Sequence, residues 1–341
     1  MYCFVLCLGV RFFLKEGIFM DILFIIDRTE LKYFEFNNLV TNFWMIREFL
    51  RNGQNVSITT IDKLGLEGQT AFAHCYGTYE KHGNIFYHRT DEKRKIEDFQ
   101  LVMFRQDPPV DMDYINSTYI FDFVDRNKTF IMNEPRAIRD FNEKLHTVEF
   151  LEFMPENIVT SSKSDILEFL NKNEEIILKP LNRCFGAGVM TLKKGDKNTA
   201  VIINTMTNNG STLVMVQKYL DKAEFGDKRV LFLGDKVLDY CVRKLPSNND
   251  FKFNEHCDAN IVKDGISQKE KENFSKVAAK LNSMGIYLAG LDVIDGKIIE
   301  INVTSPCYFI KENNHHFGCE LEKEICSYIL QKTDATLTCK I

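Results

Sequence analysis

The alternation of apolar strands and amphipathic helices in the first third of the chain is the feature that most constrains its fold. Short apolar runs bounded by turn residues indicate buried strands, and an apolar period of 3.6 residues between them indicates a helix. Strands joined through helices pair in parallel, so this alternation, from Met20 to about Asp140, predicts an open α/β sheet that binds ligands beyond its strand ends. The expected elements are strands at 22–26, 56–61 and 101–105 and a helix at 38–51.

The rest of the chain divides into two further parts, as its 341 residues lead one to expect. Residues 141–220 combine a helix, two strands and a small-residue loop, a unit small enough to be a mobile lid. Residues 221–335 combine strands with a convincing amphipathic helix that stops at Gly285. We therefore expect an extension at 1–19, an α/β domain at 20–140, a lid at 141–220 and a catalytic part at 221–335. The elements expected in the last two are helices at 165–171 and 268–284 and strands at 175–179, 212–217, 228–233, 237–244, 286–294 and 297–304.

Composition argues against several classes of function. The net charge of −5 gives no reason to expect nucleic acid or an anionic membrane as a partner. The ten cysteines include no CxxC pair, which fits a reducing cytoplasm better than a disulfide framework. Residues 2–10 are apolar but lack a basic flank and a cleavage site, and they are too short to span a bilayer. We interpret the start of the chain as an extension rather than a targeting signal.

Glu300 and Asn302 form the clearest candidate for a metal site. Two residues apart on an expected strand, they share one face, and Mg²⁺ favours such oxygen ligands beside substrate phosphates. Asp292 on the preceding strand is the natural third ligand. A two-residue turn at Asp295-Gly296 would leave Asp292 facing away from Glu300, so the metal hypothesis predicts a three-residue loop with Gly296 as a left-handed bulge. A solvated strand face remains the alternative for Glu300 and Asn302.

Several cations precede these strands and could hold an anion. Lys179 leaves an apolar strand directly before Pro180, so its ammonium either reaches water or binds an anion. Small residues at 186–188 could let backbone N–H groups approach phosphate, although most such loops are simple turns. Lys144 and Arg229 could equally be surface cations. Each residue is ambiguous alone, and their order along the chain is more informative.

The order and spacing of six motifs resemble the prokaryotic-type glutathione synthetases of the ATP-grasp superfamily, over roughly residues 20–330. The run 302–306 after the expected metal strand is specific, whereas the run 179–181 alone would not be. The resemblance implies an ATP-grasp fold, α/β with an α+β lid, made of an N-terminal open α/β domain, a lid subdomain and a C-terminal catalytic domain. The motifs are Phe104-Arg105-Gln106-Asp107-Pro108-Pro109, Asn142-Glu143-Lys144, Ile177-Leu178-Lys179-Pro180-Leu181, Asp227-Lys228-Arg229-Val230, Gly290-Leu291-Asp292 and Glu300-Ile301-Asn302-Val303-Thr304-Ser305-Pro306.

The resemblance also implies an activity. Such an enzyme joins γ-glutamylcysteine to glycine through an acyl phosphate, with ATP as co-substrate and Mg²⁺ (Mn²⁺ is possible) as cofactor. This chemistry needs positioned charges rather than a protein nucleophile. It further implies a cytosolic homo-oligomer whose partners are these small molecules. Together with the net charge, this leads us to expect no role for nucleic acid or membrane.

The resemblance carries roles over to individual positions. The implied catalytic residues are Lys179 and Arg229, and the implied metal ligands are Asp292, Glu300 and Asn302. The implied nucleotide-binding residues are Lys144, Lys179, Phe185, Gly186, Gln217, Lys218, Tyr219, Leu220 and Asp227, of which 217–220 would form a hinge whose backbone reads adenine. The implied substrate-binding residues are Arg105, Arg229, Lys244, Lys252, Asn254 and Ser305.

Two loops depart from the family pattern. After Leu181 the family carries an aspartate and glycines, where this chain has 182–185 as Asn-Arg-Cys-Phe. In the substrate loop an arginine of the family is replaced by Lys244, which keeps the charge but loses the bidentate fork. These departures keep two alternatives open: a ligase for a different amino acid or peptide, and a nucleotide-binding protein with little ligase activity.

Overall fold

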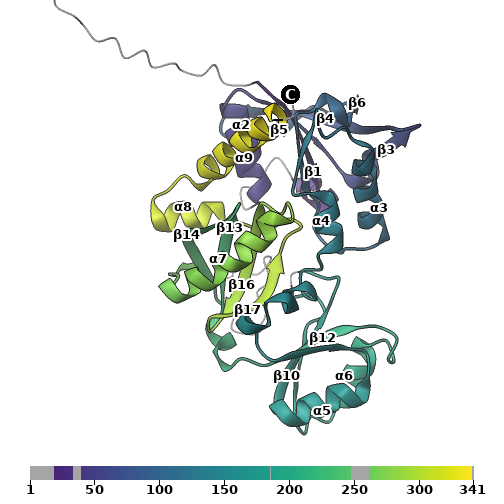
Figure 1. Ribbon diagram of the computed structural model, residues 1–341, viewed down its shortest axis with the longest axis vertical. Helices are drawn as coiled ribbons and strands as arrows, with labels where there is room; N and C mark the ends of the chain where they lie inside the picture. The colour runs from purple at the N-terminus through teal and green to yellow at the C-terminus, as the bar shows by residue number, and fades with distance from the viewer. Residues whose placement is uncertain (1–18, 34–39, 185, 247–260, 340–341) are drawn as a thin grey trace, which may run out of the picture.

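The computed structural model describes residues 19–33, 40–184, 186–246 and 261–339. Its three β-sheets follow one another along the long axis of the molecule, each flanked by helices (Figure 1). Three expected site residues, Phe185, Lys252 and Asn254, lie outside the described residues, as does nearly all of the expected extension. Within the described part of the chain, no helix is long and apolar enough to cross a membrane.

The first sheet has the parallel centre that the sequence predicts. Its order is β3-β4-β2-β1-β7-β8, with β5 and β6 paired to β4. β1 pairs in parallel with β2 and β7, and β7 with β8, so their carboxyl ends meet at one edge. The strands are β1 (Asp21–Ile26), β2 (Asn55–Thr59), β3 (Leu64–Glu67), β4 (Thr70–Lys81), β5 (Asn84–Tyr87), β6 (Glu92–Lys95), β7 (Leu101–Arg105) and β8 (Phe130–Met132).

The predicted alternation of strands and helices is wrong for 64–95. This segment is an antiparallel arm in which β4 pairs with β3, β5 and β6. Two-residue turns at Gly68 and Gly83 join the strands directly, so no helix intervenes. Ala71, Ala73 and Cys75 are buried and alternate with more exposed residues along β4, which is the period of a strand.

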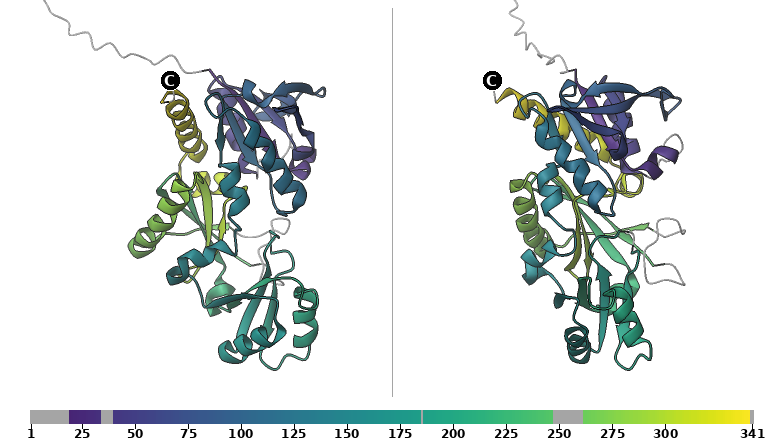
Figure 2. Two further views of the ribbon diagram at one scale, coloured as in Figure 1. Left: turned by 45° about the vertical axis from the view of Figure 1, so that its right-hand side comes forward. Right: turned by 90° about the vertical axis from the view of Figure 1, so that its right-hand side faces the viewer.

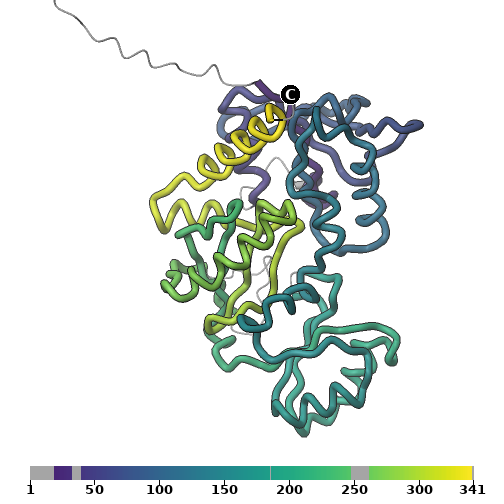
Figure 3. The backbone as a smooth tube through the Cα atoms, in the orientation of Figure 1, coloured from purple at the N-terminus to yellow at the C-terminus, as the bar shows by residue number. Residues whose placement is uncertain are grey.

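Helices cover the first sheet and return the end of the chain to it. α2 buries Phe43, Ile46 and Phe49 against the sheet, and the C-terminal helix α9 packs beside α2, as the backbone trace shows (Figure 3). The helices of this part are α1 (Arg28–Tyr33), α2 (Thr41–Arg51), α3 (Met112–Ile120), α4 (Pro135–Asp140) and the short 3₁₀ helices at 61–63, 96–98 and 121–123; α9 spans Leu321–Thr338.

The second sheet forms a unit of its own, which stands apart from the other two sheets in both views of Figure 2. Helices cover one face of it, and Ile176 and Leu178 of β10 are buried beneath them. Ile177 and Lys179 alternate with these residues and therefore point to the opposite face. The order is β11-β10-β12-β9, with β9 (Asn157–Thr160), β10 (Glu175–Pro180), β11 (Met190–Lys193), β12 (Val214–Lys218), α5 (Lys163–Asn173) and α6 (Thr199–Met206).

The third sheet is antiparallel, in the order β15-β14-β13-β16-β17. α7 covers one face with Phe274, Val277 and Leu281 fully buried, which confirms the predicted apolar side of this helix. Its opposite face carries the polar side chains described below. The elements are β13 (Asp227–Leu233), β14 (Lys236–Lys244), β15 (Ile261–Lys263), β16 (Leu288–Ile294), β17 (Lys297–Asn302), α7 (Gln268–Ser283), α8 (Ile310–Phe317) and the 3₁₀ helices at 146–153 and 221–225.

The first and third sheets share a hydrophobic core, whereas the second sheet has its own. One cluster contains Phe24 of β1, Leu288 of β16 and Ile325 of α9. Asn133, which follows β8, strengthens this junction because its buried amide donates to Leu288 O and Val303 O and accepts from the N–H groups of Tyr287 and Leu288. The third sheet is therefore held firmly at the carboxyl-end edge of the first.

Candidate active site

The hairpin of β16 and β17 brings the three candidate metal ligands to one face by a route that the sequence did not predict. The turn is a two-residue turn, with Ile294 paired to Lys297 and positive φ at both Asp295 and Gly296. The predicted three-residue loop is therefore wrong. A bulge at Ile299 shifts the register, so that Asp292 pairs with Glu300 after all.

Asp292 is the most strongly paired carboxylate of this face. Arg229 donates to it from Nε at 2.7 Å and from its second amino group at 3.2 Å, and Lys244 donates at 3.0 Å. Burial raises the pKa of the Asp292 carboxyl, but the two cations outweigh burial and hold it well below its usual value. Asn302 Nδ2 lies 3.3 Å from the same carboxylate, and Lys244 also pairs with Asp227.

Glu300 faces a second group of cations. Its Oε1 lies 2.7 Å from Lys144 Nζ, which also donates to Arg183 O at 2.6 Å. The neighbouring residue, Glu143, is buried, and its Oε1 accepts from Val303 N, Thr304 N and Thr304 Oγ1 at 2.7–2.9 Å. Burial and the negative charge of Glu300 raise the pKa of Glu143. The segment 142–144 thus bonds on one side to β17 and the residues that follow it, and on the other side to the loop after β10.

Lys179 leaves β10 on the face that looks towards these residues. Its Nζ donates to the carbonyl of the bulge residue Ile299 at 3.2 Å, and its side chain is buried. Burial, reinforced by the positive charge of Lys144, lowers the pKa of Lys179 to about 8, although Glu300 opposes the shift. Lys179 is buried, has a lowered pKa, and within the described part of the chain its ammonium bonds to a carbonyl oxygen and to no carboxylate. A lysine in this state is poised to bind an anion.

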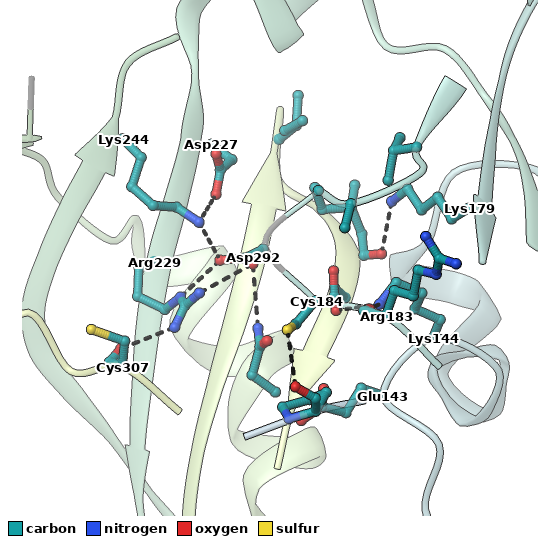
Figure 4. Close-up of a pocket in the computed structure, with 18 of the residues that line it drawn as sticks. Glu143, Lys144, Lys179, Arg183, Cys184, Asp227, Arg229, Lys244, Asp292 and Cys307 are labelled. Atoms are coloured by element: carbon teal, nitrogen blue, oxygen red, sulfur yellow. Dashed lines mark hydrogen bonds and ion pairs between the residues drawn. The ribbon is translucent and has the colours of Figure 1, made fainter. Parts of the chain in front are cut away.

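Most of the expected site residues line one cavity between the second and third sheets, closed on a third side by Asp107 and Pro108 of the first. Figure 4 shows Lys144, Lys179 and Arg183 on one side of it and Arg229, Lys244 and Asp227 on the other, around Asp292. The expected residues that line the cavity are Lys144, Lys179, Gly186, Asp227, Arg229, Lys244, Asp292, Glu300, Asn302 and Ser305.

The expected hinge, 217–220, is placed beside the cavity rather than in its lining. Lys218 N and Tyr219 N already donate to Glu156 O and Glu175 O. Gln217 pairs with Ile177, which lines the cavity, so the two side chains share that face of the sheet. The Gln217 side chain is 2% exposed, and its Nε2 donates to no group in the described part of the chain.

Arg105 lies behind the cavity wall. It is 2% exposed, donates from Nε to Asn42 Oδ1 at 2.9 Å, and donates to Pro306 O at 3.0 Å. Pro306 stands between Ser305 and Cys307, which both line the cavity. In this arrangement Arg105 supports the loop after β17, and its expected contact with substrate stays a prediction.

Family models built from known proteins match both main parts of the chain. The family model for the N-terminal domain of prokaryotic glutathione synthetase matches residues 20–139, and the model for the ATP-grasp domain of the same enzymes matches residues 143–316. The chain belongs to the prokaryotic glutathione synthetase family.

Individual relatives support the assignment to this family. Glutathione synthetase of Nitrosomonas europaea is 39% identical over 64% of this chain and 70% of the relative. Among solved structures, the D-cycloserine synthetase DcsG has a TM-score of 0.65 at 11% identity, covering 92% of this chain and 99% of that one. The ATP-grasp ligase PsnB, solved with Mg and ADP, has a TM-score of 0.60 at 16% identity, covering 92% and 98%. The last two show the fold alone. Glutathione synthetases are ATP-dependent carboxylate–amine ligases that use a divalent metal, and this chain is one of that class.

The donor set on β16 and β17 fits such a metal. Two carboxylates and an amide lie on one face, with Asp292 opposite Glu300 and in contact with Asn302. Within the residues described, no three His, Cys, Asp or Glu side chains gather to hold a metal, so a site here has two carboxylates at most. That suits an ion whose remaining ligands are phosphates and water.

Sequence reasoning missed several residues of this site. Glu143 was part of a recognised motif, but nothing in its spacing showed that it holds the amides of 303–304. Arg183 lies in the loop that departs from the family's glycines and lines the cavity, as do Cys184, Cys307 and Phe309. For Arg183 the departure at 182–185 was the available signal.

Proposed function

We propose that this chain is a glutathione synthetase, which joins the cysteinyl carboxylate of γ-glutamylcysteine to the amine of glycine. In the first step a carboxylate oxygen attacks the γ-phosphorus of ATP, the bond to the β-phosphate oxygen breaks, and ADP leaves. In the second step the glycine amine attacks the acyl carbon, loses a proton, and expels phosphate. The observation that carries the proposal is the cavity itself, which collects three lysines, two arginines and the metal-type donor set around one space.

The cations of the cavity would bind phosphate groups, and its carboxylates and one amide would bind the metal. Arg229 and Lys244 lie beside Asp292, where they would neutralise the phosphoryl group as it moves from ATP to the carboxylate. Lys144 and Lys179 lie on the opposite side, where they would hold the phosphates of the nucleotide. Asp292, Glu300 and Asn302 would hold Mg²⁺ (Mn²⁺ fits the same oxygen donors), which supplies further charge neutralisation on the phosphates when bound.

The nucleotide base has a matching place on the second sheet. Ile177 and Val189 line the cavity there, and the side-chain amide of Gln217 supplies a buried donor without a protein partner in the described part of the chain. An amide of this kind can pair with the N6 and N7 edge of adenine. We place adenine beside Gln217, with the backbone of 218–220 around it and Asp227 near the ribose.

The acceptor side of the cavity holds Ser305, with Arg105 behind it. We propose that Ser305 and Lys244 contact the peptide and glycine, that Arg105 orients the loop which carries Ser305, and that Lys252 and Asn254 complete the substrate loop. Phe185 and Gly186 would cover the phosphates.

We propose the following setting for the enzyme. It works in the cytoplasm as a homo-oligomer, with small-molecule substrates and no role for nucleic acid or membrane. Its domains are the α/β domain at 20–140, the lid at 141–220 and the catalytic part at 221–335, after an extension at 1–19. The separate core of the second sheet supports the lid as a unit.

The test is ADP release by the purified protein with Mg²⁺, γ-glutamylcysteine and glycine, each omitted in turn. We expect release only when all are present, and Mn²⁺ should replace Mg²⁺ in part. Release with another amine acceptor in place of glycine would point to a ligase of different specificity, which the departures at 182–185 allow. ATP binding without turnover on any acceptor would contradict a ligase altogether.

A further inference from the structure

The loop after β10 carries an arginine into the phosphate side of the cavity. Two of its carbonyls are bonded, since Asn142 donates to Leu181 O at 2.9 Å and Lys144 donates to Arg183 O at 2.6 Å. In addition, the Cys184 side chain donates from Sγ to Pro108 O at 3.5 Å. The position of the Arg183 backbone is therefore set by neighbours on two sides of the cavity.

The Arg183 side chain itself is exposed, and it lines the cavity. Figure 4 shows it on the same side as Lys144 and Lys179, away from Arg229 and Lys244. Gly188 lies against its stem, since a Cβ at Gly188 would meet Arg183 Cδ at 3.9 Å. Arg183 thus adds a third cation to the wall formed by the second sheet.

The cations of the cavity differ in whether a carboxylate already pairs with them. Lys144 lies 2.7 Å from Glu300, Arg229 lies 2.7 Å from Asp292, and Lys244 lies 3.0 Å from Asp292. Lys179 and Arg183 have no carboxylate within 4.0 Å anywhere in the described ranges, 19–33, 40–184, 186–246 and 261–339.

Two such cations on one wall match a ligand with more than one negative charge. A single carboxylate would neutralise one of them, whereas a polyphosphate chain can reach both. The guanidinium fork also fits two phosphate oxygens at once. We propose that Arg183 binds the polyphosphate of the nucleotide together with Lys179, an inference that rests on the proposed function only in taking ATP as a substrate.

The test compares equilibrium binding of ATP and of adenosine, both with Mg²⁺, to the full-length wild-type protein and to Arg183→Ala. Adenosine keeps the base and ribose and has no phosphate. We expect the affinity for ATP to fall at least about tenfold, as for other charge-assisted contacts, while that for adenosine stays unchanged. Arg183→Lys should lose less affinity for ATP, because lysine keeps the positive charge but cannot make the bidentate contact of a guanidinium.

Lys193→Ala is the matched control, because Lys193 is an exposed cation of the same sheet that pairs with Glu175 outside the cavity. It should bind ATP like the wild type. Two results would overturn the inference: unchanged ATP affinity in Arg183→Ala, or equal losses of affinity for ATP and adenosine. A wild type that binds ATP and makes no glutathione would count against the proposed function while leaving an ATP-specific loss in Arg183→Ala as support for this inference.

Discussion

At Glu300 the metal-type donors meet the cations of the phosphate side. Its carboxylate pairs with Lys144 at 2.7 Å and lies opposite Asp292 across the hairpin. A neutral side chain of the same shape would leave Lys144 buried without a carboxylate and would remove one charged ligand of the metal. Both changes act on the same chemical step.

We expect Glu300→Gln to lower the rate of ADP formation at least about 100-fold, since loss of a metal ligand removes several kcal/mol of charge stabilisation. The measurement is the initial rate over a Mg²⁺ titration. Asp295→Asn is the control, because Asp295 lies in the exposed turn of the same hairpin and tolerates asparagine at positive φ. An unchanged Mg²⁺ dependence in Glu300→Gln would remove Glu300 from the metal site.

Glu30, which is not one of the candidate metal ligands, should make the free energy of unfolding depend on pH. It is buried and accepts from Asn42 at 2.9 Å; burial, with a smaller contribution from Asp107, raises the pKa of its carboxyl from 4.5 to about 8. Between these two values the folded state binds more protons than the unfolded state. The contribution of Glu30 to the free energy of unfolding therefore falls as the pH rises from about 5 to about 8.

Glu30→Gln should remove this pH-dependent decrease in the free energy of unfolding. We expect the wild type and the variant to have similar free energies of unfolding near pH 5, and the variant to gain on the wild type by roughly one to several kcal/mol near pH 8. Chemical denaturation at both pH values measures the difference. A constant difference between the two proteins across this range would show that Glu30 is ionised normally in the folded state.

At the scale of single residues, a contact could be predicted when its partners were close in the sequence and was missed when they were far apart. Glu300 and Asn302 were recognisable because two residues on one strand share a face. The role of Glu143 was not, because its partners Val303 and Thr304 are 160 and 161 residues away. The burial of Arg105 was missed for the same reason, since Asn42 and Pro306 come from α2 and from the loop after β17.

At the level of elements, the hairpin of β16 and β17 contains a bulge that the sequence pattern did not predict. The turn residues and both strands were predicted, but nothing in the adjacent isoleucines Ile298 and Ile299 marks the bulge at Ile299. It has two consequences at once: it aligns Asp292 with Glu300, and it presents the carbonyl that Lys179 binds. The arm at 64–95 was missed because short turns there replace the expected helices.

Gly226 is a position where the neighbouring backbone leaves no room for a side chain. It precedes β13 with φ +83°, and a Cβ there would lie 2.0 Å from Lys244 O. Gly53, after α2, has φ +76° and open space around it. Gly53→Ala should therefore cost about 1–2 kcal/mol of backbone strain alone.

Gly226→Ala should cost roughly 1–3 kcal/mol more than that control, because the backbone of β14 must also move. The displacement would separate Lys244 from Asp227 and Asp292, so ATP turnover should fall as well. Thermal denaturation and the ADP assay measure the two effects. Equal stability losses in both variants would show that the close approach at Gly226 relaxes freely.

At the level of the whole molecule, the three sheets differ in how they are joined. The first and third share a core and the fully bonded amide of Asn133, whereas the second is held by its own core and by contacts across the cavity. The parallel centre and the order of the parts were predictable from alternation and motif order. The shared core was not, because it depends on α9 returning to α2.

Because the sheets are joined differently, truncating a buried leucine should raise hydrogen exchange in different parts of the molecule, depending on the sheet that carries it. Leu192→Ala in β11 should raise hydrogen exchange within 157–218 only, whereas Leu288→Ala in β16 should raise it in both the first and third sheets. Each change should cost about 2–5 kcal/mol in the unit that it affects. Increased exchange in β1 and β7 on Leu192→Ala would show that the second sheet is not an independent unit.

In the proposed reaction, ATP activates the carboxylate of γ-glutamylcysteine before glycine attacks. The most direct measurement uses γ-glutamylcysteine labelled with ¹⁸O in the cysteinyl carboxylate, with mass spectrometry of the phosphate and peptide products. We predict that glutathione forms and that one labelled oxygen per turnover appears in phosphate, with the other retained in the new amide. Phosphate without label, or ADP formed without glutathione, would contradict the account.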